Sequence, residues 1–171
     1  PNTFVATANA AVQIGATPRF VDINPHTYNL SLDDLEKELE KNSNKVTGIT
    51  VVHFSGNPVP MDRVNQLAET YDLFVLEDAC HAPGASWKNS EGEWVNVGAC
   101  RHSDAAVMSF HPVKHFTTGE GGAILTNDKV IADRLKLLRT HGITKDHQKF
   151  SENPGPWYYE MHDLGLNGRI T

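Results

Sequence analysis

The 171-residue sequence predicts an α/β fold in which a mainly parallel central sheet is covered by helices on both faces. Short apolar runs, typical of buried strands, alternate along the chain with segments whose apolar residues recur at helical spacing. Two of the apolar runs end in polar residues with reactive side chains, and α/β sheets bind their ligands just beyond the strand ends. The fold class therefore also indicates where a functional site is to be sought.

The first half of the chain supplies the alternation of helices and strands. Its expected elements are, in order, a loop entering a helix at 3–15, a strand at 17–23, a helix at 32–41, a strand at 48–54, a helix following 58–62 and a strand at 73–76. The helix at 32–41 carries Leu32, Leu35 and Leu39 on one stripe. Ser31 precedes this helix, and we expect it to act as the N-cap with Asp34 as its partner.

The second half is expected to complete the sheet. Its elements are a surface hairpin at 87–96, a strand at 105–108, a returning strand at 123–125 and a helix that starts near 128 and ends at 140–142. Gly142 is expected to terminate that last helix as its C′ residue.

Composition excludes several classes of function. The net charge is −6, from 21 acids against 15 bases, and no basic cluster marks a nucleic-acid partner. No apolar run approaches the roughly 18 residues of a membrane span, and no signal peptide is recognisable. Cys80 and Cys100 are isolated cysteines, which fits a reducing cytoplasm. His111 and His115 are four residues apart, but prolines interrupt the candidate segments, so no metal site is expected.

The stretch 109–128, S-F-H-P-V-K-H-F-T-T-G-E-G-G-A-I-L-T-N-D, holds one lysine on a short loop between two expected strands. Ser109 should lie at the carboxyl end of the first strand, with Lys114 five residues further on, behind Pro112. A lysine fixed there, partly desolvated and near other cationic groups, has a lowered pKa and can attack a carbonyl to form a Schiff base. The alternative, on these residues alone, is an ordinary surface lysine.

Asp78 directly follows the apolar run Leu73-Phe74-Val75-Leu76 and Glu77. A carboxylate at the dry end of a strand is costly unless it has a cationic partner. A protonated pyridine nitrogen is such a partner, and in pyridoxal phosphate (PLP) chemistry an acid opposite that nitrogen keeps the proton on. Without further residues, Asp78 could equally be a strand-end cap that takes no part in chemistry.

These motifs resemble the DegT/DnrJ/EryC1/StrS family of PLP-dependent aminotransferases, which act in nucleotide-sugar metabolism. The resemblance rests on L-E-D-A-C-H-A at 76–82 followed by S-F-H-P-V-K-H-F-T-T-G-E-G-G at 109–122. It extends to P-N-T-F-V-A-T-A-N-A at 1–10, V-V-H-F-S-G at 51–56 and L-G-L-N-G-R-I-T at 164–171. It implies the large domain of a fold-type I PLP-dependent transferase. It also implies that the chain, as a partial large domain over 1–171, is an interior piece lacking an N-terminal part and a small C-terminal domain.

The resemblance assigns roles to five residues of the expected site. It implies that Lys114 carries PLP and that Asp78 keeps the ring nitrogen protonated. His81 would hydrogen-bond the phenolic oxygen, Ser109 would donate to the cofactor phosphate, and Phe4 would stack on the pyridine ring. The last three have plain alternatives: His81 could be a loop histidine, Ser109 could simply terminate a strand, and Phe4 could be a core residue.

Residues near the end of the chain imply a shared site. Asn167 and Arg169 match an N-x-R motif that, in the family, reaches into the neighbouring subunit's site to touch phosphates, so a homodimer with shared sites is expected. The resemblance implies that Asn167 binds the cofactor and that Arg169 contacts the substrate. Gly168 stands where the family has an aromatic residue. Glu120 is either a turn residue or a substrate contact.

The function implied is transfer of an amino group from an amino acid, by analogy glutamate, to the keto carbon of a nucleotide-linked 4-keto-6-deoxy sugar. The segments H-G-I-T-K-D at 141–146 and P-G-P-W-Y-Y-E at 154–160 are most similar to members that aminate UDP-4-keto-sugars on the route to pseudaminic acid. Three alternatives remain: a sugar dehydratase of the same superfamily, a PLP-binding regulatory protein, and an inert scaffold. The dehydratases have histidine in place of the lysine, so Lys114 speaks against the first.

Overall fold

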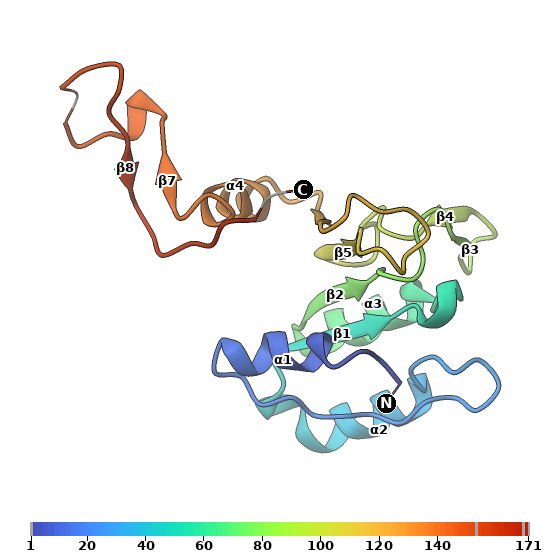
Figure 1. Cartoon of the computed structure of the whole chain (residues 1–171). Coiled ribbons are helices and arrows are strands. Elements are labelled where there is room, and N and C mark those ends of the chain that lie inside the picture. The colour runs from blue at the N-terminus through green and yellow to red at the C-terminus, as the bar shows by residue number, and fades with distance from the viewer. Residues whose placement is uncertain (1, 153, 169, 171) are drawn as a thin grey trace.

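A four-stranded sheet in the order β1-β2-β5-β6 forms the centre of the protein (Figure 1). The computed structural model describes residues 2–152, 154–168 and 170. β1 (Gly48–Val52), β2 (Phe74–Asp78) and β5 (Ala105–Ser109) are parallel, and β6 (Gly122–Leu125) returns antiparallel to β5. The expected mixed α/β fold with a mainly parallel sheet is confirmed.

The other elements surround this sheet or lie beyond its edges. They are α1 (Ala6–Gln13), α2 (Leu32–Asn42), η1 (Ser43–Lys45), η2 (Phe54–Gly56), α3 (Met61–Tyr71), β3 (Ser86–Lys88), β4 (Trp94–Asn96), α4 (Lys129–Leu138), β7 (Ile143–Thr144), η3 (His147–Lys149) and β8 (Glu160–Met161). β3 and β4 form the antiparallel hairpin expected at 87–96, and β7 pairs with β8.

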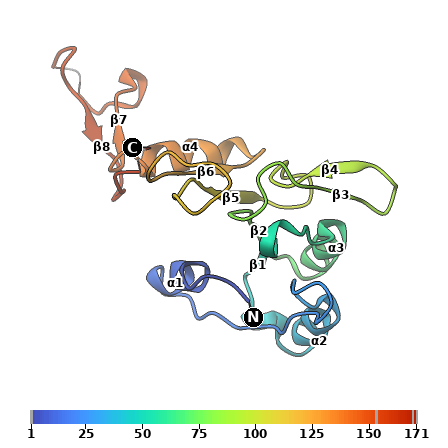
Figure 2. The ribbon, with the colours of Figure 1, turned by 45° about the vertical axis from the view of Figure 1, so that its right-hand side comes forward.

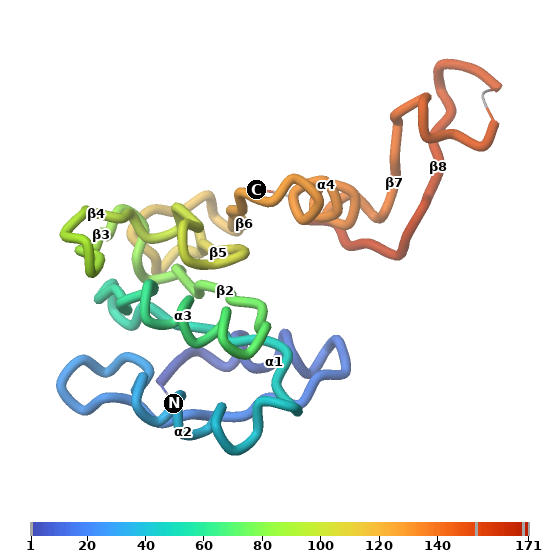
Figure 3. The backbone as a smooth tube through the Cα atoms, turned by 180° about the vertical axis from the view of Figure 1, so that it is seen from behind, coloured from blue at the N-terminus to red at the C-terminus, as the bar shows by residue number. Residues whose placement is uncertain are grey.

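The core lies between the sheet and the helices α2 and α3. α3 packs on one side of the strands and α1 lies on the other, as the front and rear views show (Figures 1 and 3). The buried apolar side chains come from both helices, from the strands and from the hairpin, and include Leu35, Leu39, Ile49, Val51, Val64, Ala68, Val75, Trp87 and Val95. By contrast α1 buries no side chain.

The N-terminus of α2 is formed as the sequence indicates. Ser31 is the N-cap, and its hydroxyl accepts a hydrogen bond from Asp34 N at 3.3 Å. Leu35 and Leu39 of the expected stripe are buried, and Leu32 packs against them at the edge of the core. Because the cap and the stripe agree, α2 is fixed both locally and by packing.

The strand expected at 17–23 is wrong. Among the described residues this segment makes only one isolated antiparallel bridge, between Ile23 and Leu30. A strand needs a continuous ladder of backbone hydrogen bonds, and Pro18 has no N–H to donate. The apolar residues favour an extended conformation, but no neighbouring strand supplies the ladder.

α4 and the β7–β8 pair extend away from the sheet (Figures 1 and 2). α4 begins after Asp128, whose carboxylate accepts hydrogen bonds from Val130 N and Ile131 N, and Gly142 follows it at a φ of +71°. α4 therefore begins where the sequence indicates, but it ends at Leu138 with Arg139 as its C-cap, so Gly142 lies beyond the C′ position expected for it. Within the part of the chain that the structure describes, no helix is long and apolar enough to cross a membrane.

Candidate functional site

The reactive residues predicted from sequence meet where β2 and β5 end. The two strands are parallel neighbours, and their register pairs Asp78 with Val107. Ser109 is the last residue of β5, so it lies at the same carboxyl edge of the sheet as Asp78. Each strand ends in a polar residue, and because the strands are parallel neighbours these two ends are brought together at one edge.

Asp78 is half-buried and is held by two hydrogen bonds. Its Oδ2 accepts from Thr7 Oγ1 at 2.7 Å, and its Oδ1 accepts from Cys80 N at 3.2 Å. Thr7 lies in the first turn of α1, and its hydroxyl is also 2.9 Å from that of Thr3. This hydrogen bond joins α1 to the end of β2.

His81 lies in the turn that follows β2. The turn is fixed by hydrogen bonds from Ala79 N to Val107 O and from Ala82 N to Ala79 O, both 2.9 Å. His81 Nδ1 is buried, and within the described residues it has no hydrogen-bond partner. A buried polar atom without a partner is costly and indicates a place for a ligand or an ordered water.

The electrostatics of His81 link it to Lys114 and Asp78. Burial, followed by the positive charge of Lys114, lowers the pKa of His81, while Asp78 acts in the opposite direction. His115 lowers it further. The imidazole therefore favours its neutral form, in which one ring nitrogen donates and the other accepts.

The pKa of the Cys80 thiol is affected by the same two charges, those of Asp78 and Lys114. Burial, then the hydrogen bond and charge of Asp78, raises the pKa of the Cys80 thiol to about 12, and the charge of Lys114 opposes that rise. A thiol with so high a pKa is not a nucleophile at neutral pH. Lys114 and Asp78 thus act on the same short turn, with Lys114 as the amine of the site.

The loop that carries Lys114 is closed by its backbone. Phe110 N donates to Gly121 O at 2.9 Å, and Thr118 N donates to Phe110 O at 3.1 Å. Lys114 N donates to His111 O at 2.9 Å, which forms a tight turn at the position of the lysine. Lys114 itself is half-buried, as the sequence analysis expects for a partly desolvated amine.

Ser109 and Phe4 lie near this edge, and their roles stay predictions. The Ser109 hydroxyl accepts a long hydrogen bond from His111 N, at 3.4 Å, which leaves its proton available to another acceptor. Phe4 is 71% exposed, and its carbonyl accepts from Thr7 N at 3.2 Å. Phe4 is therefore tied to the residue that binds Asp78, with most of its ring uncovered.

Glu120 and Arg169 are the residues predicted to contact substrate, and Asn167 is predicted to bind the cofactor. Glu120 is exposed, and its Oε1 lies 4.0 Å from His111 Nε2. Asn167 is exposed and pairs with Thr140 at the end of α4, and among the described residues its side chain makes no hydrogen bond to Asp78, His81 or Lys114. Arg169 lies outside the described residues.

Three residues that contact the cluster, Thr7, His53 and Phe54, were not among the site residues predicted from the sequence. Thr7 was not singled out, although it belongs to the motif P-N-T-F-V-A-T that marks the start of the chain. His53 and Phe54 belong to V-V-H-F-S-G, which was noted as a motif but given no role. Phe54 contacts His81 edge-on, with ring centroids 6.2 Å apart. The sequence signal for these contacts was a polar residue inside a largely apolar motif, as Thr7 and His53 are.

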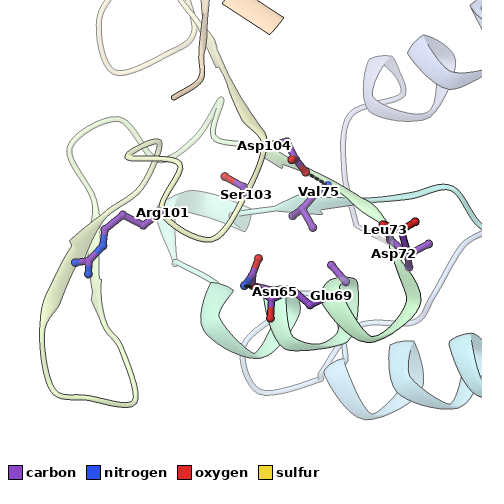
Figure 4. A pocket seen from close by; sticks show the side chains of 9 residues that line it. Asn65, Glu69, Asp72, Leu73, Val75, Arg101, Ser103 and Asp104 are labelled. Carbon is purple, nitrogen blue, oxygen red and sulfur yellow. Dashed lines mark hydrogen bonds between the residues drawn. The ribbon is translucent and has the colours of Figure 1, made fainter. Parts of the chain in front are cut away.

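A cavity of about 300 Å³ lies elsewhere, at the amino ends of β2 and β5 (Figure 4). Its lining comes from α3, the start of β2 and the segment before β5, and consists of Asn65, Ala68, Glu69, Asp72, Leu73, Val75, Arg101, Ser103 and Asp104. One of its carboxylates, Asp104 Oδ2, accepts from Val75 N at 2.7 Å and so serves the sheet. Because ligands of such sheets bind at the carboxyl edge, this cavity is not the candidate site.

The groups at the carboxyl edge fit PLP. The cofactor needs an acid for its ring nitrogen, a hydrogen-bonding group for its phenolic oxygen and a primary amine for its aldehyde. Asp78 supplies the acid, the unpartnered Nδ1 of His81 suits an oxygen ligand, and Lys114 supplies the amine. The residues present therefore match the chemistry of the group.

Comparisons with known proteins find named relatives of this chain. A UDP-4-amino-4,6-dideoxy-N-acetyl-beta-L-altrosamine transaminase of Campylobacter jejuni is 41% identical over 171 residues, which are 100% of this chain and 41% of that protein. A GDP-perosamine synthase of Escherichia coli O157:H7 is 35% identical over 170 residues, 99% of this chain and 41% of that protein. The chain thus spans about two-fifths of the length of the relatives it matches.

Solved structures give the same result. The Helicobacter pylori aminotransferase PseC, described as involved in the biosynthesis of pseudoaminic acid, matches with a TM-score of 0.81 and 32% identity over 98% of this chain and 40% of that chain. The sequence profile described as the DegT/DnrJ/EryC1/StrS aminotransferase family, whose members are PLP-dependent, matches residues 1–171. The chain therefore belongs to the DegT/DnrJ/EryC1/StrS aminotransferase family.

Proposed function

We propose that the protein binds PLP at the carboxyl edge of β2 and β5 and is part of a nucleotide-sugar aminotransferase. The reaction would move an amino group from glutamate to the keto carbon of a nucleotide-linked 4-keto-6-deoxy sugar, for cell-surface glycan biosynthesis. The observation that carries the proposal is the buried Nδ1 of His81, which has no partner among the described residues and feels the charges of both Asp78 and Lys114. A ligand with an oxygen toward His81, an amine-reactive carbon and a basic ring nitrogen would satisfy all three.

Lys114, Asp78 and His81 have separate roles in binding the cofactor and in holding or transferring protons. When bound, PLP supplies an electron sink for bonds at the carbon that carries nitrogen. Lys114 binds the cofactor through its amine and, once released, moves a proton between carbon atoms as general base and acid. Asp78, fixed by Thr7 and Cys80 N, holds a proton at the pyridine nitrogen. Neutral His81 fixes the orientation of the ring through a hydrogen bond at Nδ1.

Two further residues suit the phosphate and the ring of the cofactor. The Ser109 hydroxyl has its proton free of the His111 contact and suits a phosphate oxygen. The exposed ring of Phe4 supplies an aromatic face of the kind that stacks on a planar cofactor. Neither residue is placed against a ligand, so both assignments rest on position and chemistry.

The sugar is proposed from the names of the relatives. The Campylobacter relative is named for a UDP-linked amino sugar and the Helicobacter structure for pseudoaminic acid biosynthesis, whereas the Escherichia relative is named for a GDP-linked sugar. The higher identity to the first favours a UDP-linked substrate. Asn167 and Arg169 are proposed to bind its diphosphate from a neighbouring subunit, since amide and guanidinium groups suit phosphate oxygens.

Reduction with borohydride tests the cofactor site. The protein is incubated with PLP, reduced and digested, and the peptide that carries the cofactor is identified by mass spectrometry. We expect the label on Lys114 and its loss in Lys114→Ala, while Lys145→Ala, at an exposed lysine of a distant loop, keeps it. Label on another lysine of the wild-type chain would overturn the assignment.

A substrate panel tests the sugar. The complete enzyme is offered UDP-, dTDP- and GDP-linked 4-keto-6-deoxy sugars side by side, with glutamate as donor. We expect the highest kcat/KM with the UDP sugar. A clear preference for a dTDP or GDP sugar would refute the UDP assignment and leave the aminotransferase reaction standing.

A further inference from the structure

Two ionisable side chains are buried beneath the candidate site. His53 is 0% exposed and Glu77 is 3% exposed, and His53 Nε2 lies 3.0 Å from Glu77 Oε2. Glu77 immediately precedes Asp78 in β2, and successive side chains of a strand point to opposite faces. The pair therefore lies across the strand from the Asp78 carboxylate and does not itself reach the cofactor position.

The hydrogen bonds of the pair fix the protonation of His53. His53 Nδ1 accepts from Val59 N at 3.0 Å, so the ring proton is on Nε2 and is donated to Glu77. Glu77 also accepts from Gly98 N at 3.2 Å and from the Ser103 hydroxyl. A carboxylate with several donors and a neutral imidazole form a fully satisfied buried network, and such networks rigidify their surroundings.

His53 opens a short loop, residues 53–57, that lies against the candidate site. Its own N–H donates to Asp78 O at 3.1 Å, and Phe54 packs edge-on against His81. Gly56, at a φ of +83°, is so close to the turn that a Cβ on it would lie 2.9 Å from His81 O. The 53–57 loop thus touches both Asp78 and His81 and leaves no room between itself and the turn.

Asn29 holds the same loop from the opposite side. It is 5% exposed, its Oδ1 accepts from Phe54 N at 3.0 Å, and its Nδ2 donates to Asn57 O at 2.9 Å. The 53–57 loop is therefore anchored at one end by His53 on Glu77 and across its middle by Asn29. Both anchors are buried, polar and fully bonded, although neither faces the reacting groups.

We infer that Glu77, His53 and Asn29 are positioning residues of the aminotransferase site, which act through the 53–57 loop to hold the His81 imidazole and the end of β2 in the geometry that binds the cofactor. For its effect on the cofactor this inference rests on the proposed function. For its effect on His81 it rests on the structure alone. Loosening either anchor lets Phe54 and Gly56 move away from His81 and exposes the imidazole to water.

The experiment compares Asn29→Ala and His53→Leu with His53→Gln, which can still donate and accept, and with Leu39→Ala, a control in α2. Leu39 is 1% exposed in the core, so its truncation lowers stability without touching the 53–57 loop. The first readout is the NMR titration of the His81 imidazole in the protein without added cofactor, its resonance identified by its loss in His81→Gln. The second is the Kd for PLP, followed by absorbance, and Tm is measured for every variant.

In Asn29→Ala and His53→Leu we expect the pKa of His81 to rise toward its ordinary value. Burial is the main cause of its lowering, and the charges that face it, on Lys114, Asp78 and His115, are unchanged. The Kd for PLP should rise by about tenfold or more, since a small misplacement of a binding group costs one to two orders of magnitude. His53→Gln should restore much of both, and Leu39→Ala should change neither at a matched fall in Tm.

Unchanged His81 titration and Kd in Asn29→Ala and His53→Leu, at the Tm of the control, would overturn the inference. If His53→Leu does not fold, Asn29→Ala decides, because it removes two hydrogen bonds and leaves Glu77 paired. If the wild-type protein does not bind PLP, the proposed function fails, and the His81 titration still decides whether the loop positions this histidine.

Discussion

Replacing Glu77 by leucine is expected to destabilise the protein by about 3–5 kcal/mol, because several donors lose the buried carboxylate that they share. The contacts give the same scale. The change leaves three donors without their acceptor, His53 Nε2–H, Gly98 N–H and the Ser103 hydroxyl. Each unsatisfied donor costs about 1–3 kcal/mol when buried, and the serine can rotate to another partner, so the buried His53 Nε2–H and the partly buried Gly98 N–H set the lower bound.

Urea unfolding followed by circular dichroism measures this change, with Glu77→Gln as the matched variant. Glutamine keeps the shape and one acceptor oxygen, so its cost should be about 1–2 kcal/mol, the size of one weakened hydrogen bond. For a chain of this length the leucine variant should melt about 10 °C below the wild type. A loss below about 1 kcal/mol for Glu77→Leu would show that the network does not carry the stability argued from burial.

The pH dependence provides a second check on Glu77. Burial alone would raise its pKa, but the hydrogen bonds from His53, Ser103 and Gly98 together lower the pKa below its ordinary value of 4.5. A carboxyl group whose pKa is lowered on folding stabilises the protein above its unfolded pKa and loses that contribution as the pH falls through the folded pKa. The stability difference between wild type and Glu77→Leu should therefore be largest above about pH 4.5 and shrink below it. A constant difference down to acid pH would refute the charged state of Glu77.

Three further predictions concern the site and the residues around β8. Asp78→Asn should keep the far-UV spectrum but lower the rate of the proton shift by about 10²–10³, because a neutral partner no longer holds the pyridine proton; near-normal turnover would make Asp78 structural. Mixing inactive Lys114→Ala with inactive Asn167→Ala protomers should restore activity if sites are shared between subunits, and mixed dimers without activity would place each site in one chain. The hydrogen bond from His162, opposed by partial burial and aided by Ser151, lowers the pKa of Glu160 to about 2, so the local stability that it adds is present above pH 4.5 and lost toward pH 2. Trp157 fluorescence should change in that window in the wild type and not in Glu160→Gln, and an identical transition in both would assign it to other groups.

The sequence was sufficient where a pattern is local. Four apolar residues before an acid predicted a strand ending near Asp78, and Pro112 with the glycine-rich turn predicted a loop around Lys114; both are found. The strand expected at 17–23 failed because a strand depends on a partner elsewhere in the fold, which apolar residues alone do not guarantee.

The contacts that hold the site residues in place could not be predicted from the sequence in the same way. Thr7 and Asp78 are 71 residues apart, and His53 and Glu77 are 24 apart. No periodicity links such pairs, because they are brought together only by the order of strands in the sheet. The missing partner of His81 Nδ1 likewise depends on burial created by Phe54 and the 53–57 loop. The roles of Lys114, Asp78, His81, Ser109, Phe4, Glu120, Asn167 and Arg169 stay predictions.

The Lys114 loop has a consequence for how new reactions arise on this fold. Its shape is set by backbone bonds between Phe110, Thr118, Gly121 and His111, and among the described residues the Lys114 side chain makes no hydrogen bond that the loop needs. The residue at this position can therefore be exchanged without rebuilding the loop. A substitution at this position would change the reactive group of the site while the backbone of the loop stays as it is.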